Sequence, residues 1–183
     1  NSGTYGGAIT AVPIASLGST YTSIIVENCE FVNNLAYCGA AISINADGNG
    51  KTTYSIKNCT FIGNNATGVG STGSTSAGGA ISIARDSEGT IADSKFYNNT
   101  ATVGGAVDVS ATRSSSKVTI DNCDFENNTA TAGDGGAVRI SKNNLEVAVK
   151  NSNFTNNGAA GDGAAIYNNG VLELSGNTIS STS

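Results

Sequence analysis

The chain has 183 residues, of which Gly, Asn, Ser and Thr make up about half, and its net charge is −5. It has no histidine, which excludes a Ser-His-Asp triad, a Cys-His dyad, and zinc or haem held by histidine. The acidic balance argues against nucleic acid as a partner, and no apolar run reaches the ~18 residues that a membrane-spanning helix needs. No cofactor is expected.

Two short phrases alternate along the chain. The first, Gly-Gly-Ala-Ile or a close variant, begins at residues 6, 39, 78, 104, 135 and 163. The second has a phenylalanine at residues 31, 61, 96, 125 and 154, followed by an asparagine pair, with a degraded copy near Ile179. The phenylalanine spacings are 30, 35, 29 and 29 residues, and the Gly/Ser/Thr-rich insertion 67–77 accounts for the longest. Repeats of this length indicate a solenoid, and we expect the insertion to form a loop.

Short strands are predicted after each glycine phrase and before each phenylalanine phrase. Apolar and polar residues alternate with a period of two, as in Ile81/Ile83 before a polar stretch and Val118/Ile120 before a phenylalanine. Each unit of about 30 residues is therefore expected to hold two or three strands. One unit cannot bury its apolar side chains alone, but stacked units can. The prediction is a single all-β domain over residues 1–183, a parallel β-helix of about six rungs.

Two kinds of column follow from stacking the units. The phenylalanines are expected to stack as one buried column: Phe31, Phe61, Phe96, Phe125 and Phe154. The asparagine pairs that follow them are expected at a turn, because Asn tolerates left-handed backbone and stacked amides hydrogen-bond from rung to rung. These pairs are Asn33 and Asn34, Asn64 and Asn65, Asn98 and Asn99, Asn127 and Asn128, and Asn156 and Asn157.

The two phrases, Gly-Gly-Ala-[Ile/Val] and Phe-x-x-Asn, resemble the repeats of the chlamydial polymorphic membrane protein family and of adhesin-like surface proteins of other microbes. The resemblance covers about residues 3–179. It implies a right-handed β-helix that is displayed outside the cell or on its surface and used for adhesion or self-assembly. The partners it implies are copies of the same chain, packed head to tail, other surface proteins, or host glycans.

Three cysteines, Cys29, Cys59 and Cys123, occupy one repeat position. Neighbouring rungs are ~4.8 Å apart, which lies within the ~4.4–6.8 Å Cα range of disulfides. Cys29 and Cys59 are therefore one disulfide candidate, and Cys29 with Cys38 is the rival. Unpaired thiols in a column of small residues are the other interpretation.

Two pairs of charged residues are candidate sites. Asp134 and Asp162, each in a Gly-Asp-Gly sequence, form a weak calcium candidate, with solvated turn aspartates as the favoured interpretation. Asp108 and Arg139 fall at equivalent outward positions, in a column with Ser43, Ser82 and Tyr167. Polysaccharide lyases built on β-helices use clustered acids and bases on such a face, but one acid beside one base is interpreted here as a surface ion pair.

Asn65, Asn98 and Asn127 have the Asn-x-Thr spacing of glycosylation acceptors. Taken together, the sequence predicts an extracellular, non-enzymatic surface protein without catalytic residues. It would serve as an adhesin or as a filament or surface-layer module that stacks or continues through open β-helix ends. The alternative is a carbohydrate-binding or carbohydrate-active β-helix of the pectate-lyase type.

Overall fold

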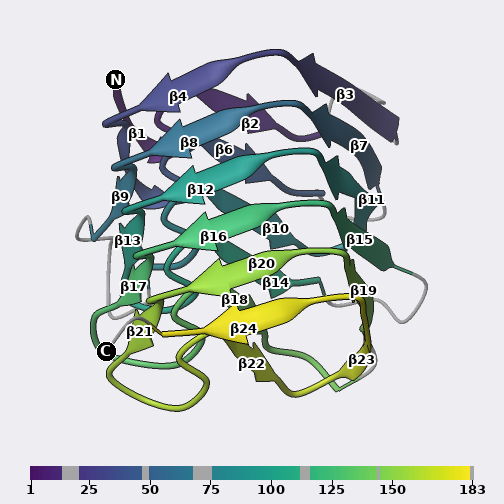
Figure 1. Ribbon diagram of the computed structural model, residues 1–183. Coiled ribbons are helices and arrows are strands. Elements are labelled where there is room, and N and C mark those ends of the chain that lie inside the picture. The colour runs from purple at the N-terminus through teal and green to yellow at the C-terminus, as the bar shows by residue number, and fades with distance from the viewer. Residues whose placement is uncertain (14–20, 47–49, 68–75, 112–115, 144, 182–183) are drawn as a thin grey trace.

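A computed structural model describes the chain except for residues 14–20, 47–49, 68–75, 112–115, 144 and 182–183. The described residues form four parallel sheets of six strands each, here called sheets A, B, C and D (Figure 1). The chain visits the sheets in the same order in every turn, so each rung adds one strand to each sheet. The predicted parallel β-helix of six rungs is confirmed.

The strands are short, and their register is continuous from rung to rung. Sheet A contains β1 (Ser2–Tyr5), β5 (Leu35–Cys38), β9 (Asn65–Ala66), β13 (Thr100–Ala101), β17 (Thr129–Ala130) and β21 (Gly158–Ala159). Sheet B contains β2 (Ile9–Ala11), β6 (Ile42–Ile44), β10 (Ile81–Ala84), β14 (Val107–Ser110), β18 (Val138–Ile140) and β22 (Ile166–Asn168). Sheet C contains β3 (Tyr21–Glu27), β7 (Lys51–Lys57), β11 (Ser87–Ala92), β15 (Lys117–Asp121), β19 (Glu146–Lys150) and β23 (Val171–Ser175). Sheet D contains β4 (Glu30–Val32), β8 (Thr60–Ile62), β12 (Lys95–Tyr97), β16 (Asp124–Glu126), β20 (Asn153–Thr155) and β24 (Thr178–Ser180).

Each rung holds four strands, so the expectation of two or three was wrong. The additional strand belongs to sheet A, which has only two residues per strand in its last four rungs. A two-residue strand such as Thr100–Ala101 is too short to show the alternation from which strands are inferred. Residues 68–75 of the insertion predicted to form a loop lie outside the described residues.

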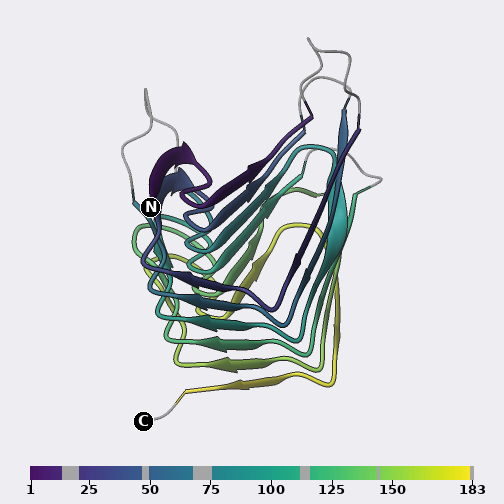
Figure 2. The same cartoon turned by 90° about the horizontal axis from the view of Figure 1, so that it is seen from above.

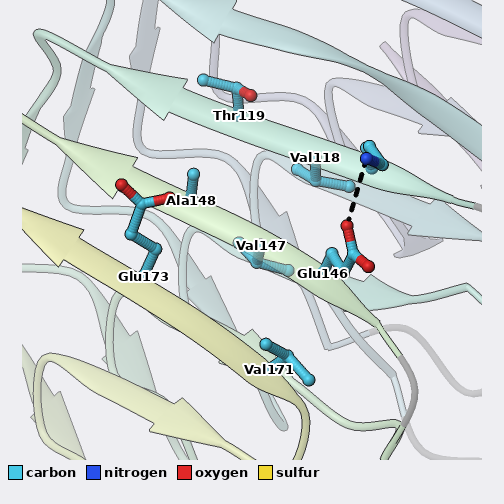
Figure 3. A pocket seen from close by; sticks show the side chains of 8 residues that line it. Val118, Thr119, Glu146, Val147, Ala148, Val171 and Glu173 are labelled. Atoms are coloured by element: carbon cyan, nitrogen blue, oxygen red, sulfur yellow. Dashed lines mark ion pairs between the residues drawn. The ribbon is translucent and has the colours of Figure 1, made fainter.

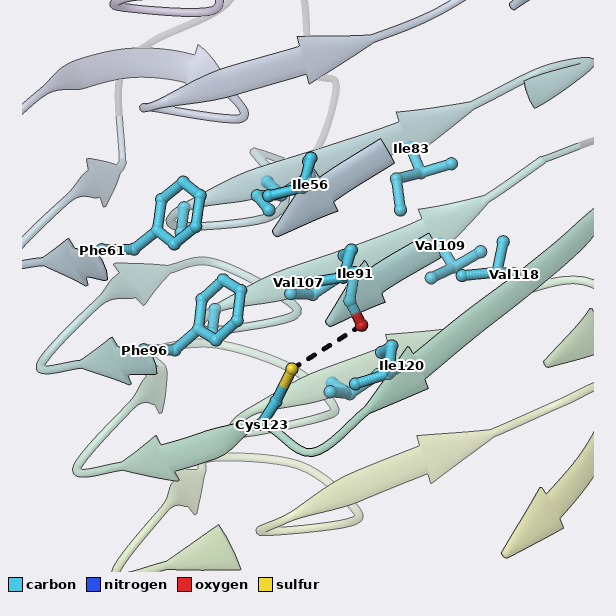
Figure 4. Close-up of a cluster of buried hydrophobic side chains, with 14 of the residues drawn as sticks. Ile56, Phe61, Ile83, Ile91, Phe96, Val107, Val109, Val118, Ile120 and Cys123 are labelled. Atoms are coloured by element: carbon cyan, nitrogen blue, oxygen red, sulfur yellow. Dashed lines mark hydrogen bonds between the residues drawn. The ribbon is translucent and has the colours of Figure 1, made fainter. Parts of the chain in front are cut away.

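The interior is filled by columns of like residues, with Ile and Val from sheets B and C facing phenylalanine from sheet D (Figure 4). The five phenylalanine rings stack with centroid distances of 4.6–5.0 Å and interplanar angles of 3–6°. The rings of Phe61 and Phe96 are fully buried, and Ile179 continues the column in β24 beside Phe154. The spacing of phenylalanines in the sequence predicted this stack.

The asparagine ladder is built from the second residue of four of the five pairs and from Asn64, the first residue of its pair. Asn99 is buried, and its Nδ2 donates to Asn128 Oδ1 of the next rung at 3.0 Å and to the Phe61 carbonyl at 3.0 Å. The same pattern joins Asn34 to Asn64, Asn64 to Asn99, and Asn128 to Asn157. In those four pairs the first residue makes the turn with a positive φ, as at Asn98 (φ 55°).

Asn65 does not belong to this ladder, which corrects the predicted pairing. Gly63 takes the turn position in that rung, with φ 60°, and Asn64 takes the ladder position. Asn65 lies in β9, in register with Leu35 and Thr100. The pair Asn64-Asn65 begins one residue later after its phenylalanine than the other pairs do. It is therefore the first asparagine of this pair, and not the second, that aligns with the ladder.

Candidate binding groove

The outer face of sheet B is indented. Viewed down the stack, sheet B runs obliquely inward from the glycine turns that follow sheet A (Figure 2). A groove of about 280 Å³ lies on this face, and it is lined by residues of the first five rungs. Its floor holds part of the outward column that the sequence analysis singled out, namely Ser43, Ser82, Asp108 and Arg139. Tyr167 continues the column in register beside Arg139 but is not among the lining residues.

The glycine phrase creates the indentation. Gly104 has φ +59°, and a Cβ built on it would lie 3.0 Å from the Cβ of Asp108. Gly135 has φ +71°, and its Cβ would lie 2.8 Å from the Cβ of Arg139. The turn before each sheet-B strand therefore folds directly onto the outward residue four positions later, which only glycine allows. As a consequence, side chains that point away from the core are still shielded from water.

Asp108 and Arg139 form a partly buried ion pair and not the predicted surface pair. Arg139 Nη1 lies 2.9 Å from Asp108 Oδ1. The Asp108 side chain is 2% exposed, and that of Arg139 is 24% exposed. The adjacent register was predicted correctly, but the periodicity of a strand shows only which side of the sheet a residue takes. The indentation that buries Asp108 comes from the neighbouring glycine turns.

The electrostatics of the groove follow from this burial. Burial raises the pKa of the Asp108 carboxyl, and the Arg139 guanidinium offsets this only in part. Burial also raises the pKa of the Cys38 thiol, a backbone hydrogen bond at Ala77 acts in the opposite direction, and the Asp108 carboxylate adds a smaller increase. The Cys38 thiol is therefore protonated at neutral pH and is a poor nucleophile.

Several groove residues were missed by the sequence analysis. Tyr5, which is 53% exposed, lines the groove in the first rung, and its ring meets that of Tyr37 edge-on at 6.3 Å. The remaining polar lining residues are Cys38, Asn45, Ser110, Ser141 and Lys142. Each lies just outside the repeating phrase, at a strand end. Their proximity could be predicted only if it were already known that each rung has four strands.

A second depression, of about 270 Å³, lies on the outer face of sheet C (Figure 3). It is lined by residues of β15, β19 and β23, among them Thr119 and Ala148. Lys117 Nζ lies 3.3 Å from Glu146 Oε2, so the two charges neutralise each other. The charges on this face are exposed and paired, whereas the groove over sheet B has the buried polar residues Ser43, Ser82 and Asp108 in its floor, so sheet B is the stronger candidate.

The four cysteines are free thiols in this structure. Cys29 and Cys59 stack in adjacent rungs, since Thr60 N–H donates to the Cys29 carbonyl at 2.9 Å. Each thiol donates to the carbonyl two residues earlier, Glu27 for Cys29 and Lys57 for Cys59. Cys38 ends a strand of sheet A, whereas Cys29 lies between sheets C and D, so the structure does not bring Cys29 and Cys38 together.

The aspartates of the weak calcium candidate lie in adjacent rungs but serve the backbone. Asp134 Oδ1 accepts a hydrogen bond from the Asp162 N–H at 2.9 Å. The described residues contain no group of three or more His, Cys, Asp or Glu side chains that could hold a metal ion. The Asp134 carboxylate therefore acts as a rung-to-rung turn cap.

The three glycosylation candidates occupy different environments. Asn98 and Asn127 are exposed at the turn between sheets D and A. Asn65 is partly buried in β9, and its Oδ1 accepts a hydrogen bond from Thr67 Oγ1 at 2.5 Å. Two of the three candidate acceptors, Asn98 and Asn127, therefore lie at exposed turns, and the third, Asn65, lies in a strand.

The class of protein that this architecture defines is the parallel β-helix. The family model for the right-handed β-helix region matches residues 17–183, and the chain belongs to this family. No curated protein and no solved structure gives a significant match. Among the described residues, no helix is long and apolar enough to cross a membrane.

Proposed function

We propose that this chain is an extracellular, non-enzymatic binding module of the adhesin type, and that the groove over sheet B recognises a glycan. The observation that carries the proposal is the contrast across sheet B. Its inner side repeats Ile and Val in nearly every rung, whereas the floor of the groove changes from Ser43 and Ser82 to Asp108 and Arg139. A rigid scaffold with a variable polar surface is typical of recognition.

The resemblance of the repeat phrases to polymorphic membrane proteins supports the extracellular part of the proposal. It is tested in the source cells with an antibody against the chain. We expect intact cells to be labelled as strongly as permeabilised cells. Labelling only after permeabilisation would contradict an extracellular location.

Glycan recognition is tested by titrating an array of immobilised glycans with the purified protein. Ser110→Tyr fills the wall of the groove, and Thr119→Tyr places the same ring on the outer face of sheet C. Both residues are partly exposed small hydroxyl residues in mid-rungs, so they make a matched pair. We expect Ser110→Tyr to weaken binding at least tenfold and Thr119→Tyr to leave it unchanged. Equal effects of the two would place recognition elsewhere.

We propose in addition that the chain stacks through the ends of its β-helix, either with further rungs or with another copy. In the last rung, Leu174 and Ile179 are 49% and 56% exposed, although their counterparts in the fifth rung, Val149 and Phe154, are buried. A further rung, from the same chain or from another copy, would cover them and pair the open sheet edges. Sedimentation of the native protein at increasing concentration tests association. A sedimentation coefficient that does not change with concentration would exclude stacking between copies.

A carbohydrate-active enzyme is the second candidate, favoured by one observation. Asp108 is a buried carboxyl with a raised pKa beside an arginine in a groove, an arrangement that general acid catalysis uses. Release of reducing ends from a panel of polysaccharides measures this activity. Cleavage by the wild type that Asp108→Asn abolishes would replace the binding proposal with the enzymatic one.

A further inference from the structure

We infer that the groove selects an anionic glycan, and that Arg139 binds a carboxylate or sulfate group of that glycan. This inference rests on the proposed function and names the ligand class of the same groove. It follows from three features of the groove: its unused arginine donors, its local charge and its neutral hydroxyl lining.

The guanidinium of Arg139 has donors that the protein does not use. Asp108 Oδ1 accepts from Nη1, whereas Nε is buried and has no hydrogen-bond partner among the described residues. An unsatisfied buried donor is unfavourable, so a ligand acceptor that reaches it would contribute to affinity by satisfying it. The edge of a guanidinium that carries Nε presents two parallel N–H groups, which match the two oxygens of a carboxylate or sulfate.

Asp108 holds this arginine in place, and part of the arginine side chain stays accessible. Only 2% of the Asp108 side chain is exposed, whereas 24% of the Arg139 side chain is exposed. A ligand therefore meets the arginine and not the aspartate. The bond to Nη1 also fixes the plane of the guanidinium before the ligand arrives, which lowers the entropic cost of binding.

The local charge has the opposite sign to that of the whole chain. The net charge of the protein is −5, but the groove lining contains two basic residues, Arg139 and Lys142, and one acidic residue, Asp108. Lys142 is exposed at the rim in the same rung as Arg139. This locally positive lining favours an anion over a neutral ligand, although the net charge of the chain is negative.

The rest of the lining favours a saccharide as carrier of that anion. Ser43, Ser82, Ser110 and Ser141 provide neutral hydroxyl groups along the groove, and the exposed Tyr5 ring offers an apolar face at its far end. The residues from Tyr5 to Arg139 span four rung steps, which corresponds to roughly 19 Å at ~4.8 Å per step. A length of this kind suits several units of a linear polymer more than a single small anion.

The experiment is a calorimetric titration with an oligouronate hexamer and with the same hexamer after reduction of its carboxyl groups to alcohols. We expect the acidic hexamer to bind at least tenfold more tightly than the neutral one. Raised salt concentration should weaken only the acidic complex.

Variants assign the effect to Arg139. Arg139→Gln alone leaves the Asp108 carboxyl buried without its partner, so the double variant Asp108→Asn with Arg139→Gln is measured as well, and thermal unfolding checks that both are folded. We expect both to bind weakly and to lose the tenfold preference for the acidic hexamer, because the contact of Arg139 with the carboxyl groups is gone in both. Lys95→Gln removes one positive charge from the outer face of sheet D and should bind like the wild type.

Each result that would contradict the inference points to a different part of it. Equal affinity of the wild type for both hexamers would overturn the anionic selectivity while leaving the glycan-binding groove in place. Selective binding that survives in the double variant would overturn the assignment to Arg139. Failure of the wild type to bind either hexamer would overturn the inference, and binding of other glycans on the array, weakened by Ser110→Tyr, would still support the proposed function.

Discussion

The phenylalanine column inside the β-helix and the outward column of sheet B have the same rung-to-rung spacing but opposite chemistry. Inside, five successive rungs carry the same residue, with rings parallel within 6°. In the outer column, successive rungs carry Ser43, Ser82, Asp108, Arg139 and Tyr167. Each interior position has nearly the same neighbours in every rung, so one side chain suits all of them. The groove position lacks this constraint, and a solenoid can therefore keep its scaffold constant while its surface diversifies.

The largest effect is expected from breaking the interior column. Phe96→Ala removes the middle ring of the stack, which is fully buried, and should destabilise the fold by about 3–5 kcal/mol. Chemical denaturation of the variant measures this. Ser82→Ala, at the floor of the groove in the same rung, should cost much less. A smaller loss for Phe96→Ala than for Ser82→Ala would reverse the comparison between the two columns.

The ladder of asparagines is the next test of the interior. Asn99→Ala leaves the N–H and the Nδ2 of Asn64 without their acceptor and the Phe61 carbonyl without one donor. Because these groups are buried, we expect a loss of about 2–3 kcal/mol in unfolding free energy. Asn98→Gly is the matched control, since glycine keeps the positive φ of the exposed neighbour. Its effect should remain within about 0.5 kcal/mol, and equal losses would show that the turn, and not the ladder, matters.

One interior residue departs from the uniform pattern and should respond in the opposite direction. Tyr54 is buried, its hydroxyl has no hydrogen-bond partner among the described residues, and Gly89 in the next rung leaves room for its ring. Tyr54→Phe removes an unsatisfied polar group and should stabilise the protein by about 1 kcal/mol. Thermal unfolding of the variant decides this. A lower melting temperature than the wild type would reveal a partner for the hydroxyl.

The smallest effect is expected in the groove and is confined to a pH window. Burial raises the pKa of Asp108 in the folded chain above its unfolded value, so the folded state binds this proton more tightly. The resulting stability is complete below the unfolded pKa of about 4 and is lost as the pH rises through the folded pKa. Wild type should therefore lose stability relative to Asp108→Asn from about pH 4 upward.

Urea midpoints of wild type and Asp108→Asn across this window measure the effect. Asp124→Asn, on the outer face of sheet D, controls for the loss of one carboxylate. A stability difference between wild type and Asp108→Asn that grows in favour of the wild type with rising pH would show that Arg139 outweighs burial.

Particular residues and strands show which parts of the fold could be predicted from the sequence. The phenylalanine spacing and the glycine phrases were sufficient to predict the parallel coil and its six rungs. The position of Asn65 was predicted wrongly, because Phe61-Ile62-Gly63-Asn64-Asn65 contains two asparagines and only the register with Phe96 selects Asn64 for the ladder. Sheet A was not predicted, because its two-residue strands owe their conformation to the rungs above and below and not to any pattern of their own.

The periodic sequence is sufficient to specify the interior of this protein, because a periodic core must be encoded by a periodic chain. The repeat positions of Phe, Asn and Gly can be identified along the chain, and stacking aligns them in columns. The environment of the outward residues depends instead on how the turns are arranged in three dimensions. Asp108 is buried because the turn at Gly104 folds over it and Arg139 lies beside it, and Tyr5 and Lys142 share its groove although 137 positions separate them in the chain. Such proximity depends on where each turn directs the backbone, which the local alternation of apolar and polar residues does not specify.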